Sequence, residues 1–146
     1  LSRQVAAEIG SPKGIIVLDP SAFPKKGTAS VGVARQWCGR LGKVEMSQVG
    51  TFLAFFKGVV WTWVDGELFL PEHWFAPEMA KERQRVGIPA ERQFATKIEL
   101  GWRMRKRVKA NRLPLSAVAC DDLYGRRFVA PANGRGGNHL HGRSAF

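Results

Sequence analysis

A hairpin signal in the first half of the chain constrains the fold more than any other feature of the sequence. Residues 47–56 (SQVGTFLAFF) form an apolar run rich in aromatic residues, and residues 59–64 (VVWTWV) alternate like a second strand. Only Lys57-Gly58 separates the two runs, which is the length and composition of a tight hairpin turn. The pattern predicts two antiparallel strands, with residues 67–71 extending or following the second.

Other segments add strands and a short helix to this hairpin. The continuous apolar run Ile15–Leu18, bounded by a glycine and a proline, predicts a strand covered on both faces. Residues 20–43 are rich in Gly, Pro, Ser and Lys and predict a long turn, with a short strand over 30–35. A short charged helix is predicted over 78–86. Residues 115–120 (LSAVAC) predict the last strand.

Capping signals predict a longer helix before the last strand. Thr96 is a helix N-cap candidate, and Glu99 three residues later completes a capping box. We expect the helix to run to about Lys109. Its apolar stripe, at i, i+4 and i+8, consists of Leu100, Met104 and Val108. Its other faces and C-terminal end carry six basic residues: Arg103, Arg105, Lys106, Arg107, Lys109 and Arg112.

Charge narrows the class of partner. The net charge is +11 and the sequence pI is about 10.5, which favours a polyanionic partner, with nucleic acid ahead of an anionic membrane surface. No apolar run approaches the length of a transmembrane helix. Cys38 and Cys120 have neither a CxxC nor a zinc-site spacing, so we predict reduced thiols in a cytosolic protein.

Two predicted strands end in a carboxylate, Asp19 on the first and Asp121 on the last. Ligands gather outside the carboxyl ends of parallel strands, and two neighbouring carboxylates repel unless a cation lies between them. Mg²⁺ prefers such oxygen ligands, and paired ions serve phosphodiester chemistry. Lys25 and Lys26 would then contact phosphate at the rim of the metal site. The alternatives are turn-forming aspartates and a solvated turn.

Several separated motifs carry a resemblance to a known family. They are residues 18–55 (beginning LDPSAFPKKG), 68–74 (LFLPEHW), 87–100 (GIPAERQFATKIEL) and 120–126 (CDDLYGR). In this order they resemble the catalytic core of bacterial insertion-sequence transposases of the DDE superfamily, in the subgroup with an Asp-x-(Ser/Thr)-x-Phe-Pro-Lys-Lys-Gly signature. The resemblance covers residues 10–126.

The resemblance implies a ribonuclease-H-like α/β fold, a mixed sheet with flanking helices, here incomplete at its C-terminal end. Asp19 and Asp121 match the first two catalytic aspartates, which hold Mg²⁺, or Mn²⁺ in its place, for hydrolysis at transposon ends and strand transfer. DNA is the implied partner, and no membrane is expected. The residues predicted to bind nucleic acid are Lys25, Lys26, Arg103 and Arg107. Asp122 is either an outer-shell partner or a turn residue.

The chain also departs from the family pattern. The family takes a third carboxylate from a helix after the second aspartate, but residues 123–146 contain no acid. We therefore predict a partial catalytic domain over 10–126, a divergent tail with little regular structure over 127–146, and little or no activity. The start of the resemblance also indicates a missing N-terminal part. The resemblance to intact members of the family implies a bacterial, cytoplasmic protein that acts on DNA and can form a homo-oligomer.

Two other interpretations stay open. One is a basic nucleic-acid-binding remnant without catalysis, and the other is a chain that folds poorly and exposes a sheet edge and apolar surface. Trp61 and Trp63 share one strand face, where core packing is favoured over stacking on bases. In the tail, His139 and His141 have a spacing that metal ligands use but lack further ligands, and NGRGGN is a single RGG-like segment.

Overall fold

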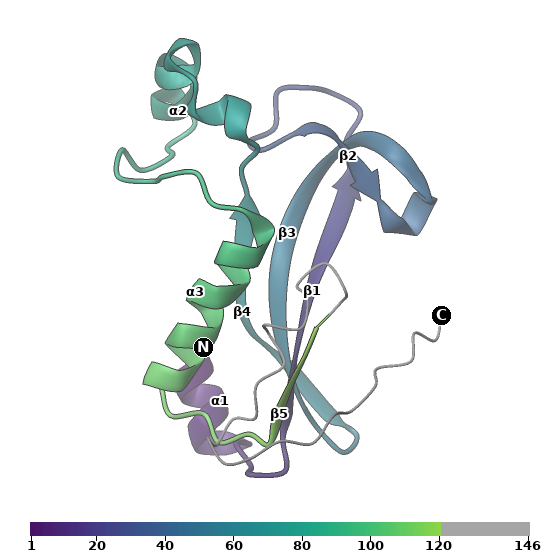
Figure 1. Ribbon diagram of the computed structural model, residues 1–146, viewed down its shortest axis with the longest axis vertical. Helices are drawn as coiled ribbons and strands as arrows, with labels where there is room; N and C mark the ends of the chain where they lie inside the picture. Colours follow the sequence, from purple (N-terminus) through teal and green to yellow (C-terminus); the bar gives the residue numbers. More distant parts are fainter. Residues whose placement is uncertain (121–146) are drawn as a thin grey trace.

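The computed structural model describes residues 1–120, which form one mixed sheet with helices packed against it (Figure 1). The elements in chain order are α1 Ser2–Glu8, β1 Ile15–Pro24, β2 Ala34–Cys38, the 3-10 turn η1 Gly39–Leu41, β3 Lys43–Lys57, β4 Val60–Phe69, the 3-10 turns η2 Glu72–Phe75 and η3 Pro77–Met79, α2 Ala80–Arg85, α3 Lys97–Ala110 and β5 Ala117–Cys120. The predicted hairpin, the two helices after it and the last strand are all confirmed, whereas α1 had no counterpart in the sequence prediction.

Strand β3 is the centre of the sheet. It pairs antiparallel with β1 along one side and with β4 and β2 along the other, and β1 pairs parallel with β5. The β3–β4 turn falls at Gly58-Val59, one residue later than predicted, because Gly58 adopts the positive φ of 59° that this turn requires. The mixture of parallel and antiparallel strands confirms the predicted α/β class.

Strand β1 is much longer than the sequence suggested. It continues through Pro20 to Pro24, so the long turn predicted over 20–43 is wrong for its first five residues, and the short strand predicted over 30–35 lies at 34–38 instead. A proline is tolerated within β1 because it lacks an amide hydrogen and needs an unpaired strand edge. In the described residues β5 pairs only with residues 15–18, so from Pro20 onward β1 pairs with β3 alone.

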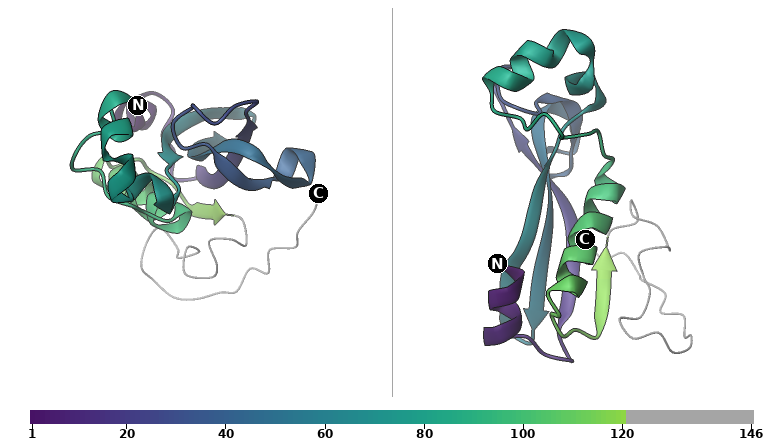
Figure 2. Two further views of the ribbon diagram at one scale, coloured as in Figure 1. Left: turned by 90° about the horizontal axis from the view of Figure 1, so that it is seen from above. Right: turned by 90° about the vertical axis from the view of Figure 1, so that its left-hand side faces the viewer.

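Helices α1 and α3 cover one face of the sheet (Figures 1 and 2). The stripe predicted on α3 is fully buried there, with Leu100 and Met104 at 0% exposure. Both hydrogen bonds of the predicted capping box are present, from the Glu99 amide to Thr96 Oγ1 at 3.2 Å and from the Thr96 amide to Glu99 Oε2 at 2.7 Å. The core beneath α1 and α3 contains Val5, Ile16, Leu18, Leu53, Phe55, Val64, Met104, Val108, Leu113 and Val118.

The opposite face of the sheet is open. Alternation along β1 buries Ile16 and Leu18 under the helices but turns Ile15 the other way, where it is 39% exposed. Trp61 and Trp63 on β4 lie on this same open face and are 54% and 49% exposed, so the prediction that they pack in the core is wrong. The expectation that the first strand is covered on both faces is wrong for the same reason.

Two further sequence predictions concern cysteines and membranes. Cys38 is buried and Cys120 is partly buried, and the two are not joined by a disulfide. Among the helices of residues 1–120, none is long and apolar enough to cross a membrane.

Candidate functional site

Asp19 lies in the middle of β1 and points to the open face of the sheet. Its backbone pairs with Phe52 on β3, and the alternation that buries Leu18 leaves the Asp19 side chain exposed. Ser21, two residues further on the same face, brings its hydroxyl Oγ to 3.5 Å from Asp19 Oδ2. The site thus presents a carboxylate and a hydroxyl, which are the hard oxygen donors that Mg²⁺ prefers.

The parallel pairing of β1 with β5 bears on the second predicted aspartate. Ile15 pairs with Ala117, and the register continues residue by residue to Leu18 with Cys120. Asp19 and Asp121 are the next residues of the two strands in the sequence. Asp121 and Asp122 lie outside the described residues, so their roles as metal ligand and neighbour stay predictions. In residues 1–120, no group of three or more His, Cys, Asp or Glu side chains comes together.

The two signature lysines lie further from Asp19 than a compact turn would place them. The backbone amide of Lys25 donates to the carbonyl of Met46 at 2.8 Å, so the chain remains beside β3 beyond the end of β1. At about 3.3 Å per residue, Lys25 is roughly 20 Å along the strand from Asp19. Lys25 is partly buried and Lys26 is exposed. The lysines therefore lie far along the sheet from the carboxylate rather than at its immediate rim.

The basic helix lies in a different layer from Asp19. Arg103 is exposed on α3. Arg107 forms ion pairs with Asp65 Oδ2 at 2.7 Å and with Glu67 Oε1 at 2.6 Å, both on β4, and Arg92 bonds Glu67 Oε2 at 3.0 Å. Since α3 packs on the buried face, the structure places Asp19 and the two α3 arginines on opposite sides of the sheet.

The ion pairs between α3 and β4 shift the ionisation of their members. Burial disfavours the charged form of Glu67, but hydrogen bonds from Arg107 and Arg92 outweigh it and hold the Glu67 pKa below its ordinary value. Burial likewise opposes the charge on Arg107, yet the hydrogen bonds to Asp65 and Glu67 raise its pKa. These groups therefore stay ionised and fasten α3 to the sheet.

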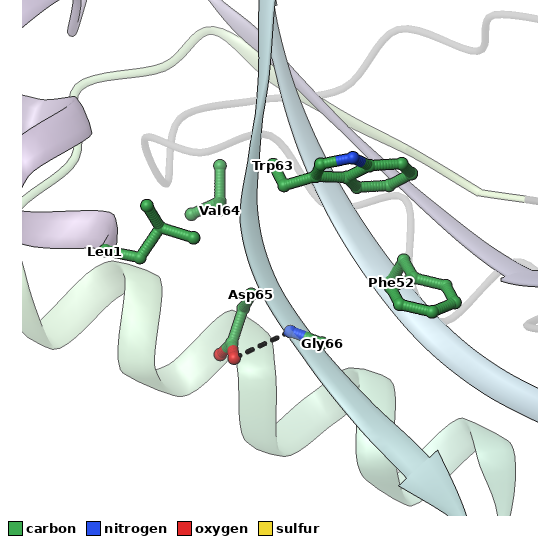
Figure 3. A pocket seen from close by; sticks show the side chains of 6 residues that line it. All are labelled: Leu1, Phe52, Trp63, Val64, Asp65 and Gly66. Carbon is green, nitrogen blue, oxygen red and sulfur yellow. Dashed lines mark hydrogen bonds between the residues drawn. The ribbon is translucent and has the colours of Figure 1, made fainter.

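An open pocket beside β4 contains little that suits catalysis. It is lined by Leu1, Phe52, Trp63, Val64, Asp65 and Gly66 (Figure 3). Its one carboxylate, on Asp65, accepts a hydrogen bond from the Gly66 amide at 2.9 Å and pairs with Arg107. Figure 3 also shows Phe52 and Trp63 on one side of β4 and Val64 and Asp65 on the other. The first pair lies on the open face of the sheet, and the second pair lies on the face that the helices cover.

Sequence reasoning missed a line of aromatic rings on the open face. We call this set the aromatic row, and its members in spatial order are Phe23, Phe52, Trp63, Trp61 and Phe56. Successive ring centroids are 6.1, 5.4, 5.7 and 6.0 Å apart. The available signal was the alternation in VVWTWV, which puts Trp61 and Trp63 on the face opposite Val64. That alternation does not by itself say which of the two faces is buried.

Comparison with known proteins identifies the class. The chain matches a family described as DDE superfamily endonuclease over residues 1–136. This match covers most of the chain, and the protein therefore belongs to the DDE superfamily endonucleases, a class of transposase-like nucleases. The mixed sheet with packed helices agrees with the ribonuclease-H-like fold of that class. Searches of the curated proteins and of the solved structures returned no match.

Membership of this family carries general expectations that agree with the site. DDE superfamily nucleases act on DNA and generally use divalent metal ions. The exposed oxygen donors of Asp19 and Ser21 suit such an ion by type, although two side chains on one strand do not complete a coordination sphere.

Proposed function

We propose that this chain is the catalytic region of an insertion-sequence transposase of the subgroup whose signature is Asp19-Pro20-Ser21-Ala22-Phe23-Pro24-Lys25-Lys26-Gly27. Its chemistry is metal-dependent hydrolysis of DNA phosphodiesters at transposon ends, followed by strand transfer to a target. Asp19 and Asp121 are the proposed metal ligands, with Mg²⁺ as the natural ion and Mn²⁺ as its substitute. The membership of the DDE superfamily supports this assignment.

The single observation that carries the proposal is the register of β1 with β5. Leu18 pairs with Cys120 in a parallel arrangement, and a carboxylate follows each of these residues in the sequence. Two carboxylates that continue this register would face the same ion. When bound between such groups, Mg²⁺ supplies Lewis-acid activation of the attacking oxygen and stabilises the leaving oxygen. Asp122 would then act as a neighbouring hydrogen-bond partner or as a turn residue.

The basic residues give the substrate a proposed path. Lys25 lies roughly 20 Å from Asp19 along β1, which corresponds to about six nucleotides at 3.4 Å per nucleotide of a duplex strand. A DNA strand laid along β1 would thus reach Lys25 and Lys26 several nucleotides from the scissile phosphate. Arg103 and Arg107 lie on the opposite side of the sheet from Asp19, so they are proposed as phosphate contacts for a separate segment of the DNA. Of the two, Arg107 is the weaker, since Asp65 and Glu67 already offset its charge.

Residues 1–146 alone are proposed to cleave DNA poorly or not at all. Residues 123–146 contain no acidic side chain, and two aspartates alone place two Mg²⁺ ions less well than three acids do. Metal-dependent cleavage of transposon-end DNA by this chain, abolished in Asp19→Asn, would overturn the proposed inactivity while supporting the proposed site. The catalytic domain is proposed to occupy residues 10–126, followed by a divergent tail.

Paramagnetic NMR tests the proposed metal site directly. In ¹⁵N-labelled protein, Mn²⁺ should broaden the amide signals near Asp19 and Cys120 and leave those of α2 sharp. Asp19→Asn should remove this broadening. Glu78→Gln, which removes an exposed carboxylate far along the chain, is the matched control and should leave it intact. Broadening that is absent, or that persists in Asp19→Asn, contradicts the proposal.

The second candidate function is a basic nucleic-acid-binding remnant without catalysis, favoured by the net charge of +11. It predicts salt-dependent DNA binding with no Mn²⁺ broadening around Asp19, which separates it from the first. For either function we propose a bacterial cytoplasmic location on DNA and assembly as a homo-oligomer.

A further inference from the structure

The open face of the sheet presents a continuous aromatic surface to solvent. Along the aromatic row the exposed fractions are 48% for Phe23, 49% for Trp63, 54% for Trp61 and 36% for Phe56, with Phe52 partly buried between them. Strand pairing fixes the row in place, because Phe23 opposes Gln48 and Phe56 opposes Trp61. Large apolar surfaces that stay open in this way mark interaction sites.

The geometry of the row suits flat ligands. Neighbouring rings are 5.4–6.1 Å apart between centroids, mostly edge to face or tilted, so each ring keeps a face or edge available. From the Phe23–Gln48 pair to Phe56 the row spans eight residues of β3, or about 27 Å. A platform of this length presents several separate stacking positions, as proteins that bind single-stranded nucleic acid do.

Cationic side chains lie at one end of the row. Lys25 and Arg35 lie on either side of Met46, since the Lys25 amide bonds the Met46 carbonyl and Arg35 pairs with Met46 across β2 and β3. At the other end Lys57 directly follows Phe56, so strand alternation turns its side chain to the opposite face of the sheet. Among the described residues, Asp19 is the one carboxylate that strand pairing puts on this face, opposite Phe52. The surface is therefore aromatic along its length and basic at the end near Met46.

We propose that the aromatic row binds a single-stranded segment of DNA, whose bases stack on the exposed rings while its phosphates contact Lys25 and Arg35. This inference rests on the proposed function, because a strand that lies along the row runs past Asp19. A second copy of the chain is the competing occupant. The net charge of +11 opposes the pairing of two such faces, whereas it favours a polyanion.

The test is the binding of a fluorescein-labelled oligothymidine of about twelve nucleotides, measured by anisotropy in EDTA so that no metal site contributes. The wild-type chain should bind it more tightly than a duplex of equal length. Combined Trp61→Ala and Trp63→Ala should weaken binding by tenfold or more, because each stacked base contributes substantially. Combined Trp61→Phe and Trp63→Phe, which keeps two rings, should recover most of the affinity. Urea unfolding checks that each variant is folded.

A charge control and an oligomer measurement complete the design. Arg35→Ala should weaken binding, and Lys106→Ala, an exposed lysine on α3, should weaken it less. The proposal is overturned if the alanine pair binds oligothymidine like wild type. It is also overturned if light scattering shows that the wild type is a dimer which the alanine pair dissociates without loss of binding. If only the proposed metal site is wrong, Mn²⁺ will not broaden the NMR signals near Asp19, but the chain will still bind oligothymidine.

Discussion

Replacing Arg107 with glutamine tests whether the ion pairs of this arginine stabilise the fold. The guanidinium donates to Asp65 Oδ2 at 2.7 Å and to Glu67 Oε1 at 2.6 Å, and the side chains of these acids are only 22% and 14% exposed. At an effective dielectric constant of about 20, each contact is roughly 6 kcal/mol of gross Coulomb energy before desolvation and side-chain entropy are subtracted. After removal, Glu67 keeps Arg92 and Asp65 keeps the Gly66 amide.

The net effect of Arg107→Gln is therefore far smaller than the gross energy. Hydrogen bonds between charged groups contribute about 1.5–3 kcal/mol, and the half-exposed guanidinium places this case near the lower end, so we expect a loss of about 2 kcal/mol in the free energy of unfolding. With a urea m-value of about 1–2 kcal/mol/M, the midpoint should fall by about 1–2 M. Urea unfolding followed by tryptophan fluorescence measures it.

Arg103→Gln is the matched control, since Arg103 lies exposed on the same helix. Its free energy of unfolding should change by no more than about 0.5 kcal/mol. A midpoint for Arg107→Gln that equals the wild-type midpoint would refute the reasoning, because the ion pairs would then contribute nothing. A larger loss in Arg103→Gln would refute it too, because it would reverse the structural ranking of the two residues.

Three further predictions concern the fold. Against the effect of burial, hydrogen bonds from Arg107 and Arg92 hold the folded Glu67 pKa below its ordinary value of 4.5, so the stabilisation from its ion pairs is present above 4.5 and is lost as pH falls through the folded pKa. Glu67→Gln should therefore show a smaller fall in unfolding free energy than wild type between pH 7 and pH 2. Thr96→Ala removes the capping box of α3 and should cost about 1 kcal/mol in urea unfolding, with Thr96→Ser near wild type. Met104→Ala empties a fully buried site and should cost about 2–5 kcal/mol, whereas Met104→Leu should cost less than about 1.5 kcal/mol.

Local sequence signals predicted α3 and the β3–β4 hairpin well because those elements depend on short-range physics. Thr96 and Glu99 satisfy the first amides of α3 by themselves, and the stripe through Met104 states which face is buried. Gly58 supplies the positive φ of the turn. Each of these features can be read from neighbouring residues alone.

The sequence could not predict the features that depend on tertiary pairing. Pro20 signalled a turn, yet β1 continues through it because β3 pairs along the whole strand. The alternation around Trp61 and Trp63 was visible, but which face the helices cover depends on the path of α3 back across the sheet. The sequence predicts that Arg107 binds nucleic acid. It does not reveal the ion pairs of Arg107 with Asp65 and Glu67, because these acids lie on β4, far away in the sequence.

The candidate site likewise combines features that neighbouring residues predict with features that depend on strand pairing. Asp19 was predicted from its place after an apolar run and from the family resemblance, and the structure puts it on an exposed strand face beside Ser21. The distance to Lys25 was misjudged because the length of β1 was misjudged. Strand β1 pairs with β5 up to Leu18 and Cys120, which is as far as the described residues extend toward Asp121.

Calorimetric titration of the chain with Mg²⁺, and with Mn²⁺ as its substitute, tests the central claim most directly. The account predicts that wild type and Glu78→Gln bind the ion, and that both Asp19→Ala and Asp121→Ala abolish binding. No binding by the wild-type chain, or equal binding in Asp19→Ala, would contradict the claim that these two aspartates form a metal site.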